Sequence, residues 1–187
     1  MSPLTELIGG AKAYGWGSFA SAGNFESIAS ASITSNTTSP VVFSNIPQTY
    51  EHLQVRIYGR FGSNGHLRLN SDTANNYYYH FASGNGSTYS AGDSESSISR
   101  MLAWGSGNND GAYPQSIVFD LLDYKNTNKY KTGKFLWGWD KNGSGTTAIT
   151  SGLWRSLSAV NTITIDANDS TIYAGAHFAL YGIKGVA

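Results

Sequence analysis

The chain of 187 residues contains no cysteine. This absence excludes a disulfide framework, a cysteine nucleophile and a cysteine-based zinc site. It does not indicate a compartment, because a chain without thiols is insensitive to redox conditions. The length predicts one domain with a core large enough to need no covalent cross-links.

Charged residues are also scarce, at 13% of the chain, and the formal net charge is zero. Nucleic-acid binders normally carry a basic excess, because contacts to phosphates supply most of their affinity. The balanced charge therefore predicts no nucleic-acid partner. No run of ~18 apolar residues occurs, so no membrane-spanning helix is predicted. The first residues lack the charged start and apolar stretch of a signal peptide.

The polar part of the sequence consists mainly of Ser, Thr, Asn and Gly, with 22 glycines and 12 tyrosines in all. These small polar residues form tight turns, and their abundance is typical of β proteins. From Phe25 onward, short segments with strand-like patterns alternate with such turn residues. The predicted strands are 25–34, 41–43, 51–61, 66–70, 76–82, 97–104, 115–124, 129–140, 147–156, 161–167 and 171–184.

The absence of helices between the strands predicts antiparallel pairing. We therefore predict an all-β fold over residues 25–187, an antiparallel β-sandwich of the jelly-roll kind. In the 51–61 strand, Leu53, Val55 and Ile57 share one face. A Gly-Ser-Asn-Gly turn follows, which predicts a hairpin with 66–70. The 115–124 segment is apolar on both faces, which predicts a central strand covered on both sides.

Residues 1–24 show no alternation and are predicted to form an extended N-terminal attachment arm. Fully extended, this segment reaches about 80 Å. It carries isolated apolar residues, which we predict to contact a partner: Leu4, Leu7, Ile8, Tyr14 and Trp16. The alternative is a terminus that packs on its own domain or is disordered.

No group of residues in the sequence predicts catalysis, a metal or a cofactor. The histidines, His52 among them, lack the close spacing of metal ligands, although the predicted hairpin would bring His52 near His66. Paired carboxylates for glycoside hydrolysis are missing as well. Asp166 and Asp169 form a turn that offers oxygen atoms to calcium, but a solvated Asx turn is the preferred interpretation.

Aromatic residues are the most informative candidates for binding. Exposed rings stack on sugars and anchor protein interfaces. Tyr77, Tyr79 and Trp139 are therefore candidate contacts for a glycan or a protein, with a place in the core as the alternative. Phe135 and Trp137 are expected to lie in the core.

Lysines recur between residues 125 and 134, which predicts a solvated face or a mild basic patch for an acidic partner. The four lysines of this stretch are Lys125, Lys129, Lys131 and Lys134.

Four stretches resemble a group of β-sandwich virion proteins of tailed bacteriophages, and the resemblance covers most of residues 25–185. They are SNIPQTYEHLQVRIYGR (44–60), FDLLDYKNTNKYKT (119–132), SGLWRS (151–156) and HFALYGIKG (177–185).

This resemblance implies a structural role in the virion, to which the chain would be added during assembly in the host bacterial cytoplasm. Related domains serve as capsid decoration (cement) proteins and as modules of tail fibres. The lone domain and its arm favour a decoration protein that binds the major capsid protein, as a trimer. The alternative is a tail-fibre, baseplate or receptor-binding domain that recognises host glycans. The resemblance implies no catalytic residue.

Overall fold

The computed structural model describes residues 25–94, 96–105 and 112–185. These residues form twelve strands and no helix. The strands are β1 (Phe25–Ser32), β2 (Val41–Phe43), β3 (His52–Gly59), β4 (Gly65–Leu69), β5 (Tyr77–Gly84), β6 (Tyr89–Asp93), β7 (Met101–Trp104), β8 (Gln115–Leu122), β9 (Lys131–Asp140), β10 (Gly145–Trp154), β11 (Ile163–Asp166) and β12 (His177–Ile183).

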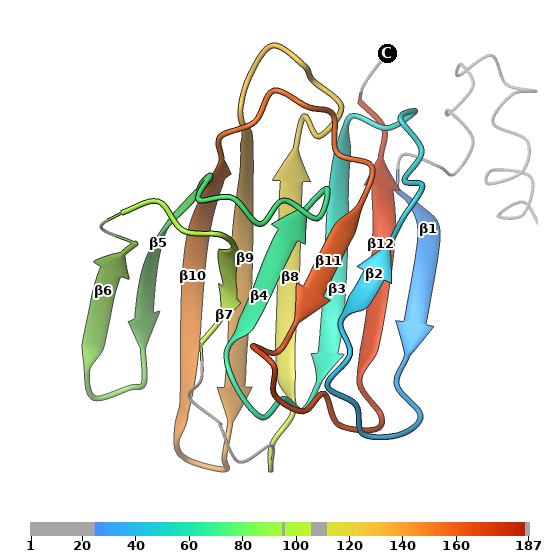
Figure 1. Ribbon diagram of the computed structural model, residues 1–187. Helices are drawn as coiled ribbons and strands as arrows, with labels where there is room; N and C mark the ends of the chain where they lie inside the picture. The colour runs from blue at the N-terminus through green and yellow to red at the C-terminus, as the bar shows by residue number, and fades with distance from the viewer. Residues whose placement is uncertain (1–24, 95, 106–111, 186–187) are drawn as a thin grey trace, which may run out of the picture.

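The strands form two antiparallel sheets that pack as a sandwich (Figure 1). The larger sheet has the order β1-β12-β3-β8-β9-β10-β5-β6, and the smaller has the order β2-β11-β4-β7. If β5, β6, β9 and β10 are set aside as insertions, every connection crosses from one sheet to the other except the one from β4 to β7. The remaining eight strands then have the double Greek-key order of a jelly roll. The predicted all-β jelly-roll sandwich is confirmed.

The inner faces of the two sheets form one core. The predicted alternation in β3 is confirmed, since Leu53 and Val55 are fully buried. Phe135 and Trp137 of β9 are buried as expected. The Phe135 ring stacks on that of Phe119 in the neighbouring strand, with the ring centroids 4.3 Å apart. Such cross-strand aromatic pairs stabilise a sheet beyond the area that they bury.

The predicted hairpin between 51–61 and 66–70 is wrong. Strand β3 pairs with β12 and β8, whereas β4 pairs with β11 and β7 in the other sheet. The Gly-Ser-Asn-Gly segment therefore carries the chain across the core. The sequence pattern did not separate the two arrangements, because strands facing each other across a sandwich alternate in the same way as strands paired in a hairpin.

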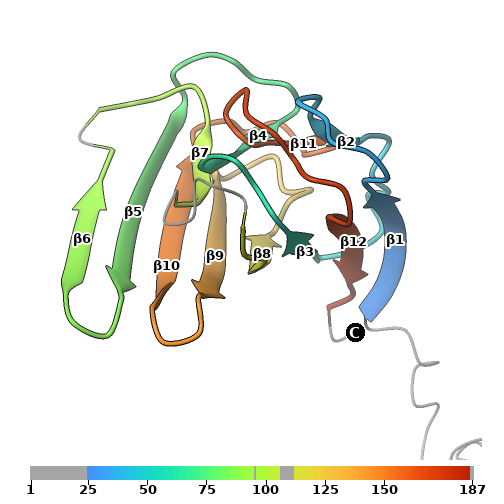
Figure 2. The ribbon, with the colours of Figure 1, turned by 90° about the horizontal axis from the view of Figure 1, so that it is seen from below.

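The prediction that the 115–124 segment is covered on both faces is also wrong. Strand β8 is central in its sheet, but the smaller sheet covers one side of the larger sheet (Figure 2). On the other side Val118 is half-buried and Leu122 is exposed. A further strand, β6, was missed, because all of its five residues are exposed and give no apolar alternation.

Candidate functional site

The larger sheet has an outer face that no other described element covers, and this face carries a line of apolar side chains. Val118 of β8 pairs with Leu136 of β9, which pairs with Ile149 of β10. Leu136 is 58% exposed and Ile149 is 50% exposed. We call Val118, Leu136 and Ile149 the apolar row. A contiguous exposed apolar patch on an otherwise polar protein is typical of an interaction site.

Polar side chains border the apolar row on one side. Asp120 pairs across the strands with Gln54 and with Lys134. The Gln54 amide donates a hydrogen bond of 2.7 Å to the Asp120 carboxylate. This arrangement of an apolar centre and a charged rim matches the anatomy of protein–protein interfaces.

A second row of paired residues runs across the outer face, on the side of the apolar row opposite to Asp120. Exposed aromatic side chains lie at its two ends. Tyr58 of β3 is 57% exposed and Tyr89 of β6 is 74% exposed. The residues of this row between the two tyrosines have small side chains. They include Ser116, Gly138 and Thr147, which pair with one another across the strands. The surface beside the apolar row is therefore flat, with a tyrosine at each end.

On the β1 side of the outer face, side chains already cover one another. The Arg56 guanidinium lies 5.1 Å from the centroid of the Phe25 ring and 5.4 Å from that of Tyr181. The two rings stack with their centroids 4.8 Å apart. The residues that offer uncovered apolar surface are thus those over β8, β9 and β10.

Tyr77, one of the predicted contact residues, lies in the core. Its ring is fully buried, and its hydroxyl group accepts a hydrogen bond from the Leu69 amide and donates to the Leu69 carbonyl. Burial raises the pKa of the Tyr77 hydroxyl. The ring is unavailable to a glycan or a partner, so Tyr77 leaves the set of candidate contacts.

Tyr79 and Trp139 are half-buried and line separate surface pockets. The Trp139 pocket, of about 350 Å³, lies at the turns that join β9 to β10 and β5 to β6. The Lys141 ammonium lies 5.1 Å from the centroid of the Trp139 ring. Both predicted aromatics therefore reach the surface, but the structure does not bring them into one site.

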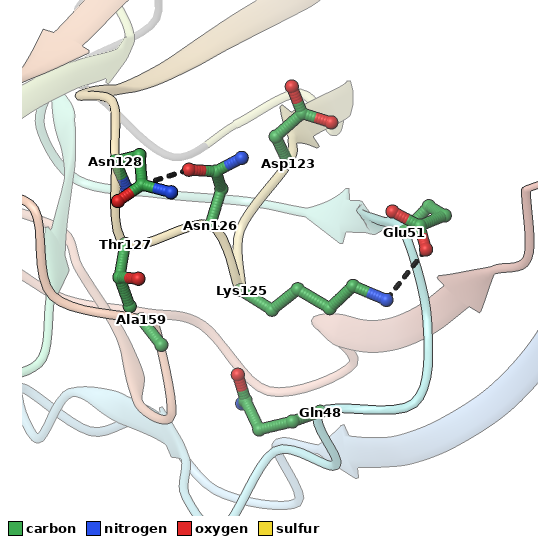
Figure 3. Close-up of a pocket in the computed structure, with 8 residues that line it drawn as sticks. All are labelled: Gln48, Glu51, Asp123, Lys125, Asn126, Thr127, Asn128 and Ala159. Atoms are coloured by element: carbon green, nitrogen blue, oxygen red, sulfur yellow. Dashed lines mark hydrogen bonds and ion pairs between the residues drawn. The ribbon is translucent and has the colours of Figure 1, made fainter.

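A pocket of about 550 Å³ lies between three loops at one end of the sandwich (Figure 3). Lys125 extends across it to Glu51, with 2.6 Å between the ammonium and a carboxylate oxygen. Gln48 donates hydrogen bonds to two backbone carbonyls. Asp123 binds Lys129, which lowers the pKa of that carboxyl. The charges of this polar pocket are thus paired with one another.

The predicted lysine patch does not form one surface. Lys125 and Lys129 are held in the ion pairs just described, and Lys134 lies on the outer face of the larger sheet. Lys131 is fully buried. The stretch therefore offers no continuous basic surface to an acidic partner.

Asp166 faces cations of its own chain. Its carboxylate accepts a hydrogen bond of 3.0 Å from Arg68 and one of 2.8 Å from the Asn168 amide. Asn168 and Asp169 have positive φ angles, as in the preferred Asx-turn interpretation. His66 lies next to Asp166, whereas His52 is far from both, near Asp123.

Among the described residues, no group of three or more histidines and carboxylates could hold a metal ion. In the same part of the chain, no helix is long and apolar enough to cross a membrane. The predicted arm contacts Leu4, Leu7, Ile8, Tyr14 and Trp16 lie outside the described residues.

The sequence predictions did not include the apolar row. The signal for it was present, because Leu136 lies between the buried Phe135 and Trp137, and Ile149 lies beside the buried Ala148. Successive residues of a strand point to opposite faces, so apolar residues at consecutive positions mean that both faces carry apolar side chains. We interpreted this pattern only in the 115–124 segment, as burial on both sides, although exposure of one face explains it equally.

The chain matches no protein-family model and no curated protein sequence. Two solved structures match the chain at low similarity. An exo-inulinase from Aspergillus awamori is 10% identical, with a TM-score of 0.35 over 85% of this chain and 29% of the inulinase chain. The galectin LEC-6 from Caenorhabditis elegans is 12% identical, with a TM-score of 0.31 over 80% of this chain and 96% of the galectin. The chain thus spans less than a third of the inulinase.

Proposed function

We propose that this chain is a structural protein of a tailed-phage virion, a decoration protein that binds the head shell through its outer sheet face. The observation that carries the proposal is the apolar row, which is exposed beside a flat, tyrosine-flanked surface. The resemblance of the sequence to phage virion proteins supports it. The same resemblance implies that the partner is the major capsid protein and that the chain forms a trimer.

The physical basis of such binding is burial of apolar area. Covering the Leu136 and Ile149 side chains contributes roughly 1.5–3 kcal/mol each when burial is complete. Both residues are about half exposed, so about half of that value is still to be gained. Because each 1.4 kcal/mol changes a binding constant tenfold, the pair contributes about tenfold or more to affinity.

The test measures co-sedimentation of the purified full chain with head shells from which it has been removed. We expect the double variant Leu136→Ser/Ile149→Ser to weaken binding about tenfold. Val42→Ser is the matched control, because Val42 is 51% exposed on the outside of the smaller sheet. Binding unchanged in the double variant would rule out the outer face as the docking surface.

A second experiment tests the location in the virion. Quantitative mass spectrometry of purified particles gives the copy number of the chain. Hundreds of copies are expected for a head component, whereas a few to a few tens indicate a tail or fibre. Deletion of residues 1–24 tests the arm, since shell binding that survives the truncation would remove the arm from the proposal.

Glycan recognition by a tail component is the second candidate function. The observation in its favour is that Tyr79 and Trp139 each line a surface pocket. Glycan-array binding that is lost in Tyr79→Ala or Trp139→Ala would support this function. An array without signal would count against it.

A further inference from the structure

One pocket, of about 410 Å³, lies where strands β4 and β5 meet the segment that leads into β7. This volume falls in the range of small-molecule sites, about 300–1,000 Å³. Ile98 exchanges two backbone hydrogen bonds of 2.9 Å with Tyr77, so the segment is fixed beside β5. The walls of the pocket therefore come from three elements held in place by the sheets.

This pocket has a basic side chain at one end. His66 and Arg100 line it. Behind His66 lies Asp166, which Arg68 binds at 3.0 Å. The Asp166 carboxylate is thus bound by Arg68, and Arg100 is the charged side chain among the residues that line the pocket. Arg100 forms no hydrogen bond or ion pair with any other residue that the structure describes, so its charge is available to a ligand.

Two buried nitrogen atoms of the same cluster lack hydrogen-bond partners within the described residues. They are Nδ1 of His66 and Nε of Arg68. The His66 nitrogen is 3.7 Å from the Asp166 carboxylate, which is too long for a hydrogen bond. Buried polar atoms without partners are costly, but these two are shielded beside Asp166. The group that a ligand in the pocket can reach is the Arg100 guanidinium, and its positive charge favours an anionic ligand.

The remaining walls are uncharged and suit a polyol. Tyr79 contributes an aromatic ring, which stacks on the apolar face of a sugar. Asn75, Ser97 and Ser99 contribute amide and hydroxyl groups, which exchange hydrogen bonds with sugar hydroxyls. An aromatic ring, neutral polar groups and a cationic end are thus combined in one pocket.

We propose that this pocket binds an acidic sugar, with the carboxylate at Arg100 and His66 and the sugar ring against Tyr79. The inference rests on the second candidate function, glycan recognition, and names the class of glycan. It does not depend on docking through the apolar row. Charge-assisted hydrogen bonds to Arg100 are expected to provide the selectivity for the acid.

The test titrates the full chain with methyl glucuronide and with methyl glucoside, which differ by the carboxylate, and records NMR shift changes and calorimetric affinity. We expect the glucuronide to bind at least tenfold more tightly. Arg100→Gln is expected to remove this difference. Arg60→Gln is the control, because Arg60 lies elsewhere, over the Tyr173 ring at 5.2 Å. Near-UV circular dichroism verifies that each variant is folded.

The other outcomes distinguish a failure of the acidic-sugar proposal from a failure of glycan recognition as a whole. Equal binding of both sugars would overturn the acidic class and leave glycan recognition standing. No binding of either sugar, together with a silent glycan array, would overturn both. A third titration uses inorganic phosphate. If phosphate binds in an Arg100-dependent manner and the glucuronide does not, the pocket is an oxyanion site and the sugar assignment is wrong.

Discussion

At the residue scale, Lys131 departs most from the behaviour of its residue type. The sequence predicted a solvated side chain, yet Lys131 is fully buried on the inner face of β9. Its ammonium donates to the backbone carbonyls of Lys129 and Ser156, at 3.0 and 3.4 Å. Desolvation lowers the pKa of the Lys131 ammonium. Because carbonyls carry only partial charges, they compensate incompletely for the lost hydration.

The lowered pKa of Lys131 predicts a pH-dependent stability. Between the folded-state pKa and the ordinary value of 10.5, the unfolded chain binds more protons than the folded chain. Stability from this group therefore rises with pH across that window. We expect wild type to gain stability relative to Lys131→Met as the pH rises towards 10.5, measured by urea unfolding. Parallel pH profiles of the two proteins would contradict this prediction.

Tyr77 gives a second prediction at this scale. Tyr77→Phe keeps the ring but leaves the Leu69 amide and carbonyl without their buried hydroxyl partner. An unsatisfied buried polar group costs about 1–3 kcal/mol, so we expect a loss of that size in the free energy of unfolding. Tyr89→Phe is the control, because Tyr89 is 74% exposed and should change stability by less than about 0.5 kcal/mol.

At the scale of elements, alternation predicted most of the strands but did not predict their partners. Leu53 and Val55 identified β3, and their burial followed from the pattern. The pairing of β3 with β12 joins segments more than a hundred residues apart, and no local signal encodes it. The same limit hid the crossing at 62–65, which resembles a hairpin turn in sequence.

Gly65, at that crossing, shows why a glycine is needed at the start of β4. A Cβ atom there would lie 2.0 Å from the ring of Trp104, which is fully buried. Gly65→Ala must displace this ring, and we expect destabilisation of about 1–3 kcal/mol by thermal or urea unfolding.

Gly84→Ala serves as the matched control for Gly65→Ala. Gly84 also lies in a strand, but the nearest atom to an added Cβ there is 3.9 Å away. We expect a change below about 0.5 kcal/mol for this variant. A similar loss in both variants would mean that backbone preference and not the Trp104 contact sets the cost.

At the scale of the whole molecule, the two candidate sites differ in how far the sequence predicts them. The apolar row has a sequence signal, because β8, β9 and β10 carry apolar residues on both faces. The pocket has none. His66, Tyr79 and Arg100 are separated by many residues and converge only because β4, β5 and the segment before β7 lie together. Residue type identified Tyr79 as a candidate contact, but no pattern in the sequence places it beside His66 and Arg100.

The scarcity of charge means that few carboxylates determine how the whole fold responds to acid. Asp166 is the most buried of them. Burial opposes ionisation of its carboxyl, but the nearby His66, the Asn168 amide and Arg68 outweigh it, and the pKa of Asp166 is lowered. A lowered folded-state pKa gives stability that is present above the ordinary value of 3.8 and is lost as the pH falls below it.

We therefore expect Asp166→Asn to lose about 1–3 kcal/mol at pH 7, because Arg68 is left without its carboxylate. The difference from wild type should shrink as the pH falls from 5 towards 2, since protonation removes the same charge. Asp169→Asn, exposed in the same turn, should match wild type at every pH. Urea unfolding across this range measures all three proteins, and a constant difference between Asp166→Asn and wild type would show that the charge of Asp166 does not contribute to the acid response.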